Sequence, residues 1–481
     1  MVFSSTVFLF LFLPLTLLLY ALMPRNGRNG LLLAASLLFY AWGEVFYVGI
    51  MMMSIALNYC VGLAVERHRN RPSVRWILAA GVAANLLLLG VFKYANFLVD
   101  NLNQILAPFG ISAFHIEPVH LPIGLSFFTF QAISYVVDVY RNRAPARHNP
   151  IHVALYISLF PQLIAGPIVR YHQIARELVE RTVTAEGFTI GVRRFTIGLG
   201  KKVLIANPLG AVATQIFDLP SNEWTAGVAW LAIVCYTLQI YFDFSGYSDM
   251  AIGLGRMFGF HFPENFNYPY VARSVREFWR RWHISLSTWF RDYLYIPLGG
   301  SRVGTGRTAF NLVLVFFLCG LWHGASWNFV IWGLLHGTFL GVERTAFGPW
   351  LDRQWRPIRH AYTLGVVVLA WVFFRVDRLP DALTFLSALA GFGHGSAAVW
   401  NAERYLTGHV IAMLIVGVIA ATPVVPAIVS RLQHAQTALP FAAPAPRLAL
   451  DVADAALFLI LLASVSSLAA GTFNPFIYFR F

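Results

Sequence analysis

Charged residues are scarce in this chain, at 12% of its 481 residues. An ordinary soluble domain carries about 25%. Acidic residues are the scarcer kind, with 22 Asp and Glu against 35 Lys and Arg and a formal net charge of +13. Hydrophobic residues make up 58% instead, in long uninterrupted runs. This composition excludes an ordinary soluble protein and indicates one that resides in a membrane.

Cysteine is nearly absent as well. The three cysteines, Cys60, Cys235 and Cys319, lie in apolar stretches and have neither disulfide nor zinc-ligand spacing. We expect them to be small buried packing residues, and we expect no metal site. An internal repeat is also lacking, which weighs against many transporter folds.

Apolar runs of about 17 to 25 residues, the length that spans a bilayer, recur along the whole chain. The first, Val7 to Met23, follows no basic residue and precedes a poor cleavage site, so we expect a retained helix rather than a signal peptide. We predict an all-α polytopic protein of roughly ten to twelve membrane segments, with residues 1–481 forming a single integral membrane domain. Prolines and a glycine interrupt Ile151 to Pro167, which predicts a re-entrant or broken helix. The stretch from Arg431 to Arg447, rich in Ala and Pro, is the best candidate for a long loop.

Basic residues gather in short loops between the apolar runs, as in the cytoplasmic loops of membrane proteins. These residues are Arg25, Arg28, Arg67, Arg69, Arg71, Arg75, Arg141, Arg143 and Arg147. The acidic segments Asp218 to Glu223 and Asp377 to Asp381 then fall outside, together with the N-terminus and the tail that follows Leu450 to Ala470. The same net charge in a soluble protein would suggest a nucleic-acid partner. Here we expect membrane lipid as the partner and no nucleic acid.

The segment from Arg273 to Arg302 carries aromatic and basic residues at helical spacing. One face holds Phe278, Trp282, Leu286, Trp289 and Tyr293, and the other holds Arg276, Arg280, His283, Ser287 and Arg291. We predict one amphipathic helix at the cytoplasmic interface. Two interpretations stay open. The helix either anchors on anionic lipid, or its arginines Arg276, Arg280 and Arg291 hold an anion such as the phosphates of coenzyme A.

His323 interrupts an apolar stretch. The run before it, Ala309 to Trp322, spans roughly 21 Å as a helix, less than the hydrocarbon thickness of about 30 Å. A second run begins at Trp327, so we expect His323 below the membrane surface, at a break flanked by Gly320 and Gly324. Intramembrane ionisable residues are candidates for functional sites, and neutral imidazole can accept a proton from a hydroxyl. The alternative is a histidine that only packs two helices together.

Other polar residues in apolar segments could support such a site. Asp243 and Asp249 lie in QIYFDFSGYSDMAIG and could orient a histidine or bind a cation, although structural hydrogen bonds are more common for such residues. His336 lies in the middle of a regular helical pattern, which favours a packing role. Trp322 directly precedes His323.

Five segments together resemble the membrane-bound O-acyltransferase (MBOAT) family, and most of all its bacterial polysaccharide branch, which includes the alginate O-acetyltransferase membrane component. They are PIGLSFFTFQAISYVVDVYR from Pro122, FPQLIAGPIVR from Phe160, YFDFSGYSDMAIGLGRMFGF from Tyr241, FWRRWHISLSTWFRDYLYIPLGGSR from Phe278 and LWHGASWNFVIWGLLHG from Leu321. The remaining helices match the family in character more than in motif.

The resemblance implies a ring of helices around a central tunnel, some of them re-entrant or broken. It implies that His323 is the catalytic histidine and that His283 is the second, more variable polar residue of the site. The donor would be acetyl-CoA as a co-substrate on the cytoplasmic side of a bacterial inner membrane, with no bound cofactor. The acceptor would be a polysaccharide or cell-wall glycan outside, reached through a periplasmic or surface esterase-like partner. The related D-alanyl branch uses a carrier-protein thioester instead, and the sequence does not separate the two donors.

The chain ends in the aromatic tail 472–481, which includes NPFIYFRF. We expect this tail on the extracytoplasmic side of the membrane, packed against the protein or the membrane interface. It resembles the C-terminal motif of small membrane proteins that accompany D-alanyl transferases, in which a tyrosine carries the acyl group. The hypothesis that follows is a relay, in which His323 activates Tyr478 and an acyl-tyrosine forms. The alternative is an interfacial aromatic anchor.

Two other classes of function use the same residues. A transporter could move an acyl donor without chemistry, and it would form no acyl-enzyme. A scaffold that only recruits secreted enzymes would keep its function after His323→Ala.

Overall fold

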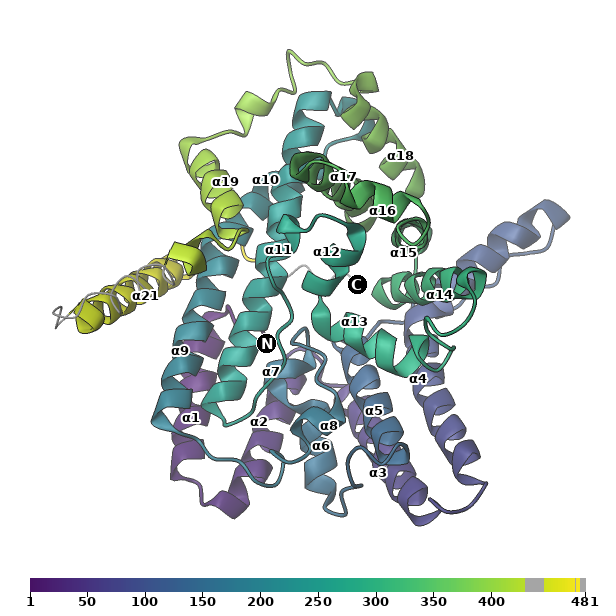
Figure 1. Ribbon diagram of the computed structural model, residues 1–481, viewed down its shortest axis with the longest axis vertical. Coiled ribbons are helices and arrows are strands. Elements are labelled where there is room, and N and C mark those ends of the chain that lie inside the picture. Colours follow the sequence, from purple (N-terminus) through teal and green to yellow (C-terminus); the bar gives the residue numbers. More distant parts are fainter. Residues whose placement is uncertain (429–444, 472, 476–481) are drawn as a thin grey trace.

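The computed structural model describes residues 1–428, 445–471 and 473–475. Within this part of the chain, helices are the regular structure and no strand forms, as the sequence predicts (Figure 1). Six helices are long and apolar enough to cross a membrane, and five shorter apolar helices of 10–17 residues accompany them. The chain is therefore an all-α, multi-pass membrane protein.

The N-terminal third contains the first eight α-helices. They are α1 (Leu13–Leu22), α2 (Arg28–Ala41), α3 (Val48–Arg67), α4 (Val74–Leu106), α5 (Leu125–Tyr140), α6 (Pro150–Ser158), α7 (Phe160–Leu163) and α8 (Tyr171–Ile174). The first apolar run is helical, with a π-helical turn at Phe8–Phe12 leading into α1. The predicted break in Ile151 to Pro167 is confirmed, because Leu159 has an extended ψ of 112° between α6 and α7.

The middle and C-terminal parts supply the remaining helices. The middle part consists of α9 (Ala185–Gly200), the π-helical segment η4 (Lys201–Ala206), α10 (Asn207–Phe217), α11 (Ala226–Met257), α12 (Val275–Arg281), α13 (Ile284–Phe290) and the π-helical turn η7 (Arg291–Tyr295). The C-terminal part consists of α14 (Thr305–His323), α15 (Trp327–Val342), α16 (Phe347–Asp352), α17 (Arg356–Arg375), α18 (Leu379–Ser387), α19 (Gly408–Ala420) and α21 (Ala445–Ala469). The predicted loop from Arg431 to Arg447 lies largely outside the described residues, and its last three residues belong to α21.

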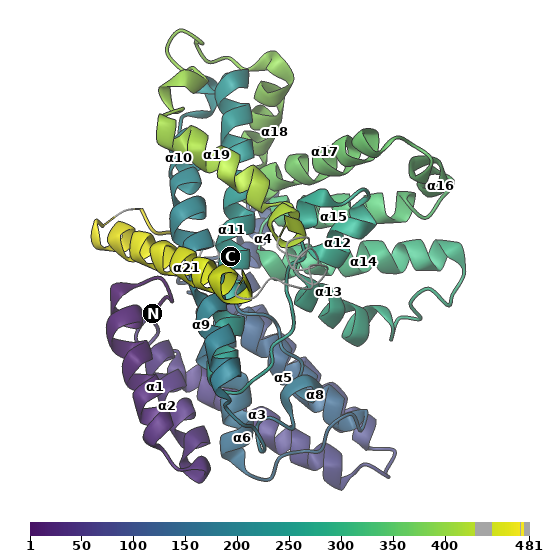
Figure 2. The same cartoon turned by 60° about the vertical axis from the view of Figure 1, so that its left-hand side comes forward.

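Helix α11 runs through the middle of the molecule, with α9 and α10 on one side and α12 and α13 on the other (Figures 1 and 2). It lies against α9 at glycine contacts. A Cβ atom on Gly198 would approach the carbonyl oxygen of Gly246 to 2.5 Å, and one on Gly246 would approach that of Gly198 to 2.7 Å. Only glycine allows this separation, which is how membrane helices pack most closely. Helix α21 packs against the outer side of α9 and projects from the body.

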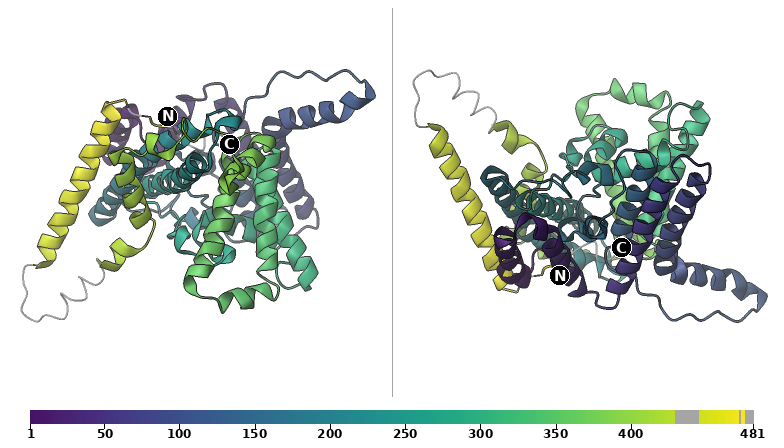
Figure 3. Two further views of the ribbon diagram at one scale, coloured as in Figure 1. Left: turned by 90° about the horizontal axis from the view of Figure 1, so that it is seen from above. Right: turned by 90° about the horizontal axis from the view of Figure 1, so that it is seen from below.

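Helix α4 is longer than a bilayer requires. Its 33 residues span about 50 Å, against about 30 Å of hydrocarbon. Its C-terminal end and the chain that returns to α5 project from the other helices (Figure 3). The N-terminal half of α4 packs against α3 and α5.

The three cysteines differ in their surroundings. Cys235 and Cys319 are buried, as predicted, but the prediction is wrong for Cys60, which is exposed on α3. An apolar neighbourhood implies burial in a soluble protein. On a membrane helix it is equally compatible with a lipid-facing surface.

Candidate active site

His323 is the last residue of α14 and lies at the predicted helix break. Gly324 follows in an extended conformation, and α15 begins at Trp327. The His323 side chain is buried, with 4% of its surface exposed. Aromatic rings enclose the imidazole, with centroid distances of 4.9 Å to Trp322, 5.0 Å to Trp332 and 5.1 Å to Phe374. The break therefore presents an imidazole within an aromatic cage.

The two helices that meet at this break pack closely. A Cβ atom on Gly320 would clash with the backbone of Phe329, and one on Gly333 with the backbone of Phe316. Glycine at both positions lets α14 and α15 cross in contact. This contact fixes the direction of α14 and hence the position of His323 at its end.

The Nδ1 atom of His323 is buried and has no hydrogen-bond partner among the described residues. Buried polar atoms in native structures nearly always have a partner, and an exception calls for an explanation. A substrate hydroxyl or amide would supply the partner that the described residues lack.

His283 lies between α12 and α13 with φ 44° and ψ 53°, and its side chain is fully buried. Its Nδ1 atom is 3.0 Å from Oδ1 of Asn265, an oxygen that also accepts from the Ser285 hydroxyl at 2.9 Å. The amide nitrogen of Asn265 donates to Ser248, so the oxygen of that amide faces His283. Nδ1 of His283 must therefore carry the proton, which leaves Nε2 as an acceptor. That Nε2 atom is buried and has no partner within the described part of the chain.

The two histidines approach each other through aromatic rings. The His283 ring is 6.2 Å from the ring of Trp322, whose own ring is 4.9 Å from that of His323. Phe244 contacts the other side of His283 edge-on, at 4.7 Å. The structure thus brings together three predicted site residues, His323, His283 and Trp322.

The prediction of one amphipathic helix from Arg273 to Arg302 is wrong. The segment divides into α12, α13 and η7, and Trp282 is extended. The cause is a neighbouring loop, because the amide of Asn267 donates to the carbonyl of Arg281 and the amide of Ile284 donates to the carbonyl of Asn265, each at 2.9 Å. These bonds replace the helical ones and turn His283 inward. The aromatic face packs into the protein core instead of lying on a surface, since Phe278, Trp282, Leu286 and Trp289 are buried.

The three candidate anion-binding arginines do not lie together. Arg276 and Arg280 line a cavity of about 470 Å³ with Arg281, Glu343 and other polar residues. Arg291 is not among the residues that line this cavity and instead pairs with Asp292 at 2.7 Å. Arg276 donates to the carbonyl of Glu343 at 3.0 Å.

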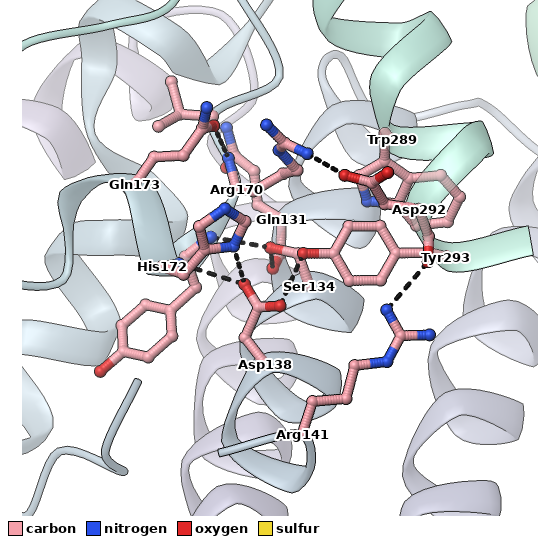
Figure 4. Close-up of polar contacts among 12 residues, drawn as sticks. Gln131, Ser134, Asp138, Arg141, Arg170, His172, Gln173, Trp289, Asp292 and Tyr293 are labelled. Carbon is pink, nitrogen blue, oxygen red and sulfur yellow. Dashed lines mark hydrogen bonds and ion pairs between the residues drawn. The ribbon is translucent and has the colours of Figure 1, made fainter. Parts of the chain in front are cut away.

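A polar cluster around Asp138 and Asp292 joins α5, α8 and η7 (Figure 4). Asp138 is fully buried and accepts from Nδ1 of His172 at 2.8 Å and from the Tyr293 hydroxyl at 2.9 Å. Asp292 pairs with Arg170 and Arg291. Burial raises the pKa of Asp292, but the hydrogen bond and charge of Arg291, together with the charges of Arg170 and Arg143, outweigh burial and hold that pKa below its usual value.

Sequence reasoning did not single out this cluster. The available signal was Asp138, an acidic residue inside the apolar run Leu121 to Val139. Its oxygens are fully occupied by donors from the protein, so its role is to fasten the three elements together.

The supporting candidates have structural partners. Asp243 pairs with Lys202 at 2.7 Å, and Asp249 pairs with Lys201 at 2.6 Å and with Arg194 at 2.9 Å. Neither aspartate contacts a histidine in the described structure. Nδ1 of His336 accepts from the indole N–H of Trp279 at 3.2 Å. These contacts agree with the packing interpretation for Asp243 and Asp249, whereas the buried Nε2 atom of His336 has no partner among the described residues.

Two further cavities are lined by residues that neighbour the histidines, although neither histidine lines them. One of about 440 Å³ between α9 and α11 is lined by Asp249, Asn265 and other residues, and Asn265 is the partner of His283. The other, of about 270 Å³, is lined by Lys93, Gly324 and residues of α15 and α17. The continuous tunnel stays a prediction.

The start of the tail is held by side chains of three other segments. The Asn474 amide donates to the carbonyl of Ser4 at 3.0 Å, and its oxygen accepts from Asn207 at 3.1 Å and from the Ser4 hydroxyl at 3.3 Å. Lys202 donates to the carbonyl of Pro475. Tyr478 lies outside the described residues.

The fold and site define a multi-pass membrane protein with two buried imidazoles, each with a ring nitrogen that has no partner among the described residues. Residues 30–376 match the model of the membrane-bound O-acyltransferase family, MBOAT. The chain belongs to this family, and it is a membrane O-acyltransferase.

Among similar proteins, the probable alginate O-acetylase AlgI of Azotobacter vinelandii is 44% identical over the full length of both chains. The peptidoglycan O-acetyltransferase of Helicobacter pylori is 38% identical over 81% of this chain and 80% of its own. The teichoic acid D-alanyltransferase of Bacillus subtilis is 27% identical over 64% of this chain and 78% of its own.

Proposed function

We propose that this protein is an O-acetyltransferase of the bacterial inner membrane, which passes acetyl groups from cytoplasmic acetyl-CoA towards an exported polysaccharide or cell-wall glycan. The names of the similar proteins support acetyl as the acyl group, because a full-length relative is a probable alginate O-acetylase and the D-alanyl enzyme matches less of the chain at lower identity. The observation that carries the mechanism is the buried, unpartnered Nδ1 of His323 at the helix break.

In the proposed reaction, His323 accepts the proton of the acceptor hydroxyl through an unprotonated ring nitrogen. The hydroxyl oxygen attacks the carbonyl carbon of the thioester and a C–O bond forms. The C–S bond then breaks, and the leaving thiolate takes the proton from the imidazolium. The products are the acetyl ester, coenzyme A as its thiol and a neutral imidazole ready for another cycle.

His283 orients the donor in this proposal. Its Nε2 atom is an acceptor, because Asn265 holds the proton on Nδ1. A hydrogen bond from an amide N–H of the pantetheine arm would place the thioester near Trp322, which touches both histidines. Arg276, Arg280 and Arg281 line a cavity beside the carboxylates of Glu277, Glu343 and Asp352, and the guanidinium groups there would bind the phosphates of coenzyme A in a bidentate manner.

Tyr478 is the proposed first acceptor within residues 472–481, the aromatic tail. Its hydroxyl would receive the acetyl group from the thioester, and the tyrosyl ester would then be passed to a periplasmic or surface esterase-like partner. The contacts that hold Asn474 support this idea, because they fix the start of the tail against the helices.

The test of His323 uses purified protein in proteoliposomes and ¹⁴C-acetyl-CoA, with release of coenzyme A as the assay. His323→Ala is expected to lower kcat by about 10²- to 10⁴-fold, the usual contribution of a general base. Phe310→Ala, at a side chain that is 53% exposed on the same helix, is the matched control. Normal turnover by His323→Ala would exclude the proposed chemistry and favour a scaffold.

Intact-mass measurement after incubation with acetyl-CoA tests the relay. We expect one added acetyl group in the wild-type chain and none in Tyr478→Phe. A Tyr478→Phe variant that transfers acetyl groups at the wild-type rate would show that the relay is wrong while leaving His323 as the base. Uptake of labelled donor without coenzyme A release would instead identify a transporter.

The acceptor class is tested in cells by measuring ester-linked acetate on the secreted polymer and on peptidoglycan. Loss of acetate from one of them in a deletion strain, restored by the wild-type gene and not by His323→Ala, identifies that polymer. Unchanged acetate on both polymers would contradict the proposed acceptor class.

A further inference from the structure

Helix α4 contacts the end of α14 that carries His323. The ammonium group of Lys93 donates to the carbonyl oxygens of Trp322 and His323, the latter at 3.1 Å, and to the Ser126 hydroxyl at 3.3 Å. The hydroxyl of the next residue, Tyr94, donates to the carbonyl of Leu321 at 2.6 Å. Two consecutive residues of α4 therefore bind three consecutive carbonyls of α14.

These carbonyls are the ones that a helix cannot satisfy by itself. The last four carbonyls of any α-helix lack an intrahelical partner, and in α14 they belong to Gly320, Leu321, Trp322 and His323. The amide of Gly324 donates to the first, at 3.2 Å. Lys93 and Tyr94 supply donors to the other three. An unpaired carbonyl at membrane depth costs several kcal/mol, and a cation also interacts favourably with the negative end of the helix dipole.

The same face of α4 contacts the other side of the break. The ring of Phe97 packs edge-on against Trp327, the first residue of α15, with centroids 5.8 Å apart. The side-chain oxygen of Asn101 accepts from the Trp327 indole at 2.9 Å. Lys93, Phe97 and Asn101 recur at intervals of four residues, so they share one helix face. This face spans the gap from the end of α14 to the start of α15.

The contacts of Lys93 also indicate which kind of role it has. Lys93 is buried within an apolar helix, where a lysine is costly and marks a functional site by default. No carboxylate forms an ion pair with it in the described part of the chain, and its three N–H donors meet three oxygens. Because all three donors are occupied, the ammonium group holds the backbone in place and is neither a nucleophile nor an anion site.

We infer that Lys93 and Tyr94 are positioning residues, and that α4 acts as a splint that holds the α14–α15 break in the geometry that presents His323 to its substrate. This inference rests on the proposed role of His323. The splint binds the backbone of His323, so it determines where the imidazole lies without touching the reacting atoms. A misplacement of about 1 Å in a catalytic group can cost about 10²-fold in rate.

The test compares Lys93→Met, Lys93→Arg and Tyr94→Phe with the wild type in the coenzyme A release assay. Methionine keeps an unbranched side chain, one atom shorter than that of lysine, and removes its donors. We expect kcat to fall at least tenfold in Lys93→Met with KM for acetyl-CoA within twofold, because the donor site is unchanged. Arginine restores donors and should recover at least a third of kcat. Leu87→Ala, at a side chain 69% exposed on the same helix, is the control and should keep wild-type kcat.

The outcomes separate the inference from the proposed function. If His323→Ala is inactive and Lys93→Met keeps kcat within twofold, Lys93 is not a positioning residue and the role of His323 stands. If both variants keep wild-type turnover, the proposed role of His323 is refuted, and the positioning role of Lys93, which depends on it, is refuted with it. If Lys93→Met does not accumulate in the membrane, Tyr94→Phe decides, since it loses one hydroxyl. An at least threefold lower kcat at constant KM supports the splint, and an unchanged kcat overturns it.

Discussion

Replacing Asn474 by alanine removes three hydrogen bonds that hold the start of the tail to Ser4 and Asn207. A typical intramolecular hydrogen bond contributes about 0.5–1.5 kcal/mol net. Losing three lowers the free energy of opening by about 1.5–4.5 kcal/mol if they act independently. Since 1.4 kcal/mol corresponds to a factor of ten, the open population rises roughly ten- to thousandfold.

Hydrogen exchange measures this opening directly in the detergent-solubilised protein. The amides to follow are those of Ala470 and Gly471, which donate to the carbonyls of Ser466 and Leu468 close to Asn474 and should exchange faster in Asn474→Ala by up to the stated factor. Ser4→Ala removes one of the three bonds and leaves the backbone acceptor, and Asn207→Ala also removes one, so each should accelerate exchange by about tenfold at most. Through the relay, the rate of acetyl transfer should fall in the same order. Wild-type exchange in all three variants would refute the reasoning.

Three further outcomes are expected. Lys202→Met or Asp243→Leu alone should lower the free energy of unfolding by about 3–5 kcal/mol, because each leaves an unpaired buried charge. The double variant should recover most of that loss, and equal losses in all three variants would contradict this. Gly246→Leu should prevent the close contact of α9 and α11, giving a Tm in detergent well below that of Gly30→Leu, whose surroundings are open. The pKa of Asp292 lies below its usual value in the folded state. The stability that its carboxylate gives the fold is therefore fully present above the unfolded pKa of about 3.9 and is lost as the pH falls through the pKa of the folded state. Melting curves of Asp292→Asn should therefore show less loss of Tm between pH 5 and pH 3 than wild type, a range chosen to bracket about 3.9.

The sequence predicts those features that depend on the length of an apolar run. The break at His323 follows from a run too short to cross the bilayer, and the break in Ile151 to Pro167 follows from its prolines. Both are present. The length of a run does not show which side of a helix faces the protein, so the sequence predicts burial for Cys60, which is exposed.

Features that depend on contacts between distant segments could not be read from spacing. The periodicity of Arg273 to Arg302 is correct for α12 and α13 separately, but the backbone of Asn265 and Asn267 competes for hydrogen bonds at Arg281 to Ile284 and divides them. The sequence contains no sign of that competition. Lys93 was visible as a charge in an apolar run, yet its partners are carbonyl groups, which every residue has.

The hydrogen bonds between Ser4 and Asn474 join residues that are 470 positions apart in the sequence. Synthesis runs from the N-terminus, so Ser4 and Asn207 are in place long before their common partner leaves the ribosome. The segments that carry His323 and His283 are inserted before that contact can form. Only a chain that extends at least to Asn474 can form this contact. In the proposed relay, a chain that stops short of Asn474 would hold the donor and the base but have nowhere to deliver the acetyl group.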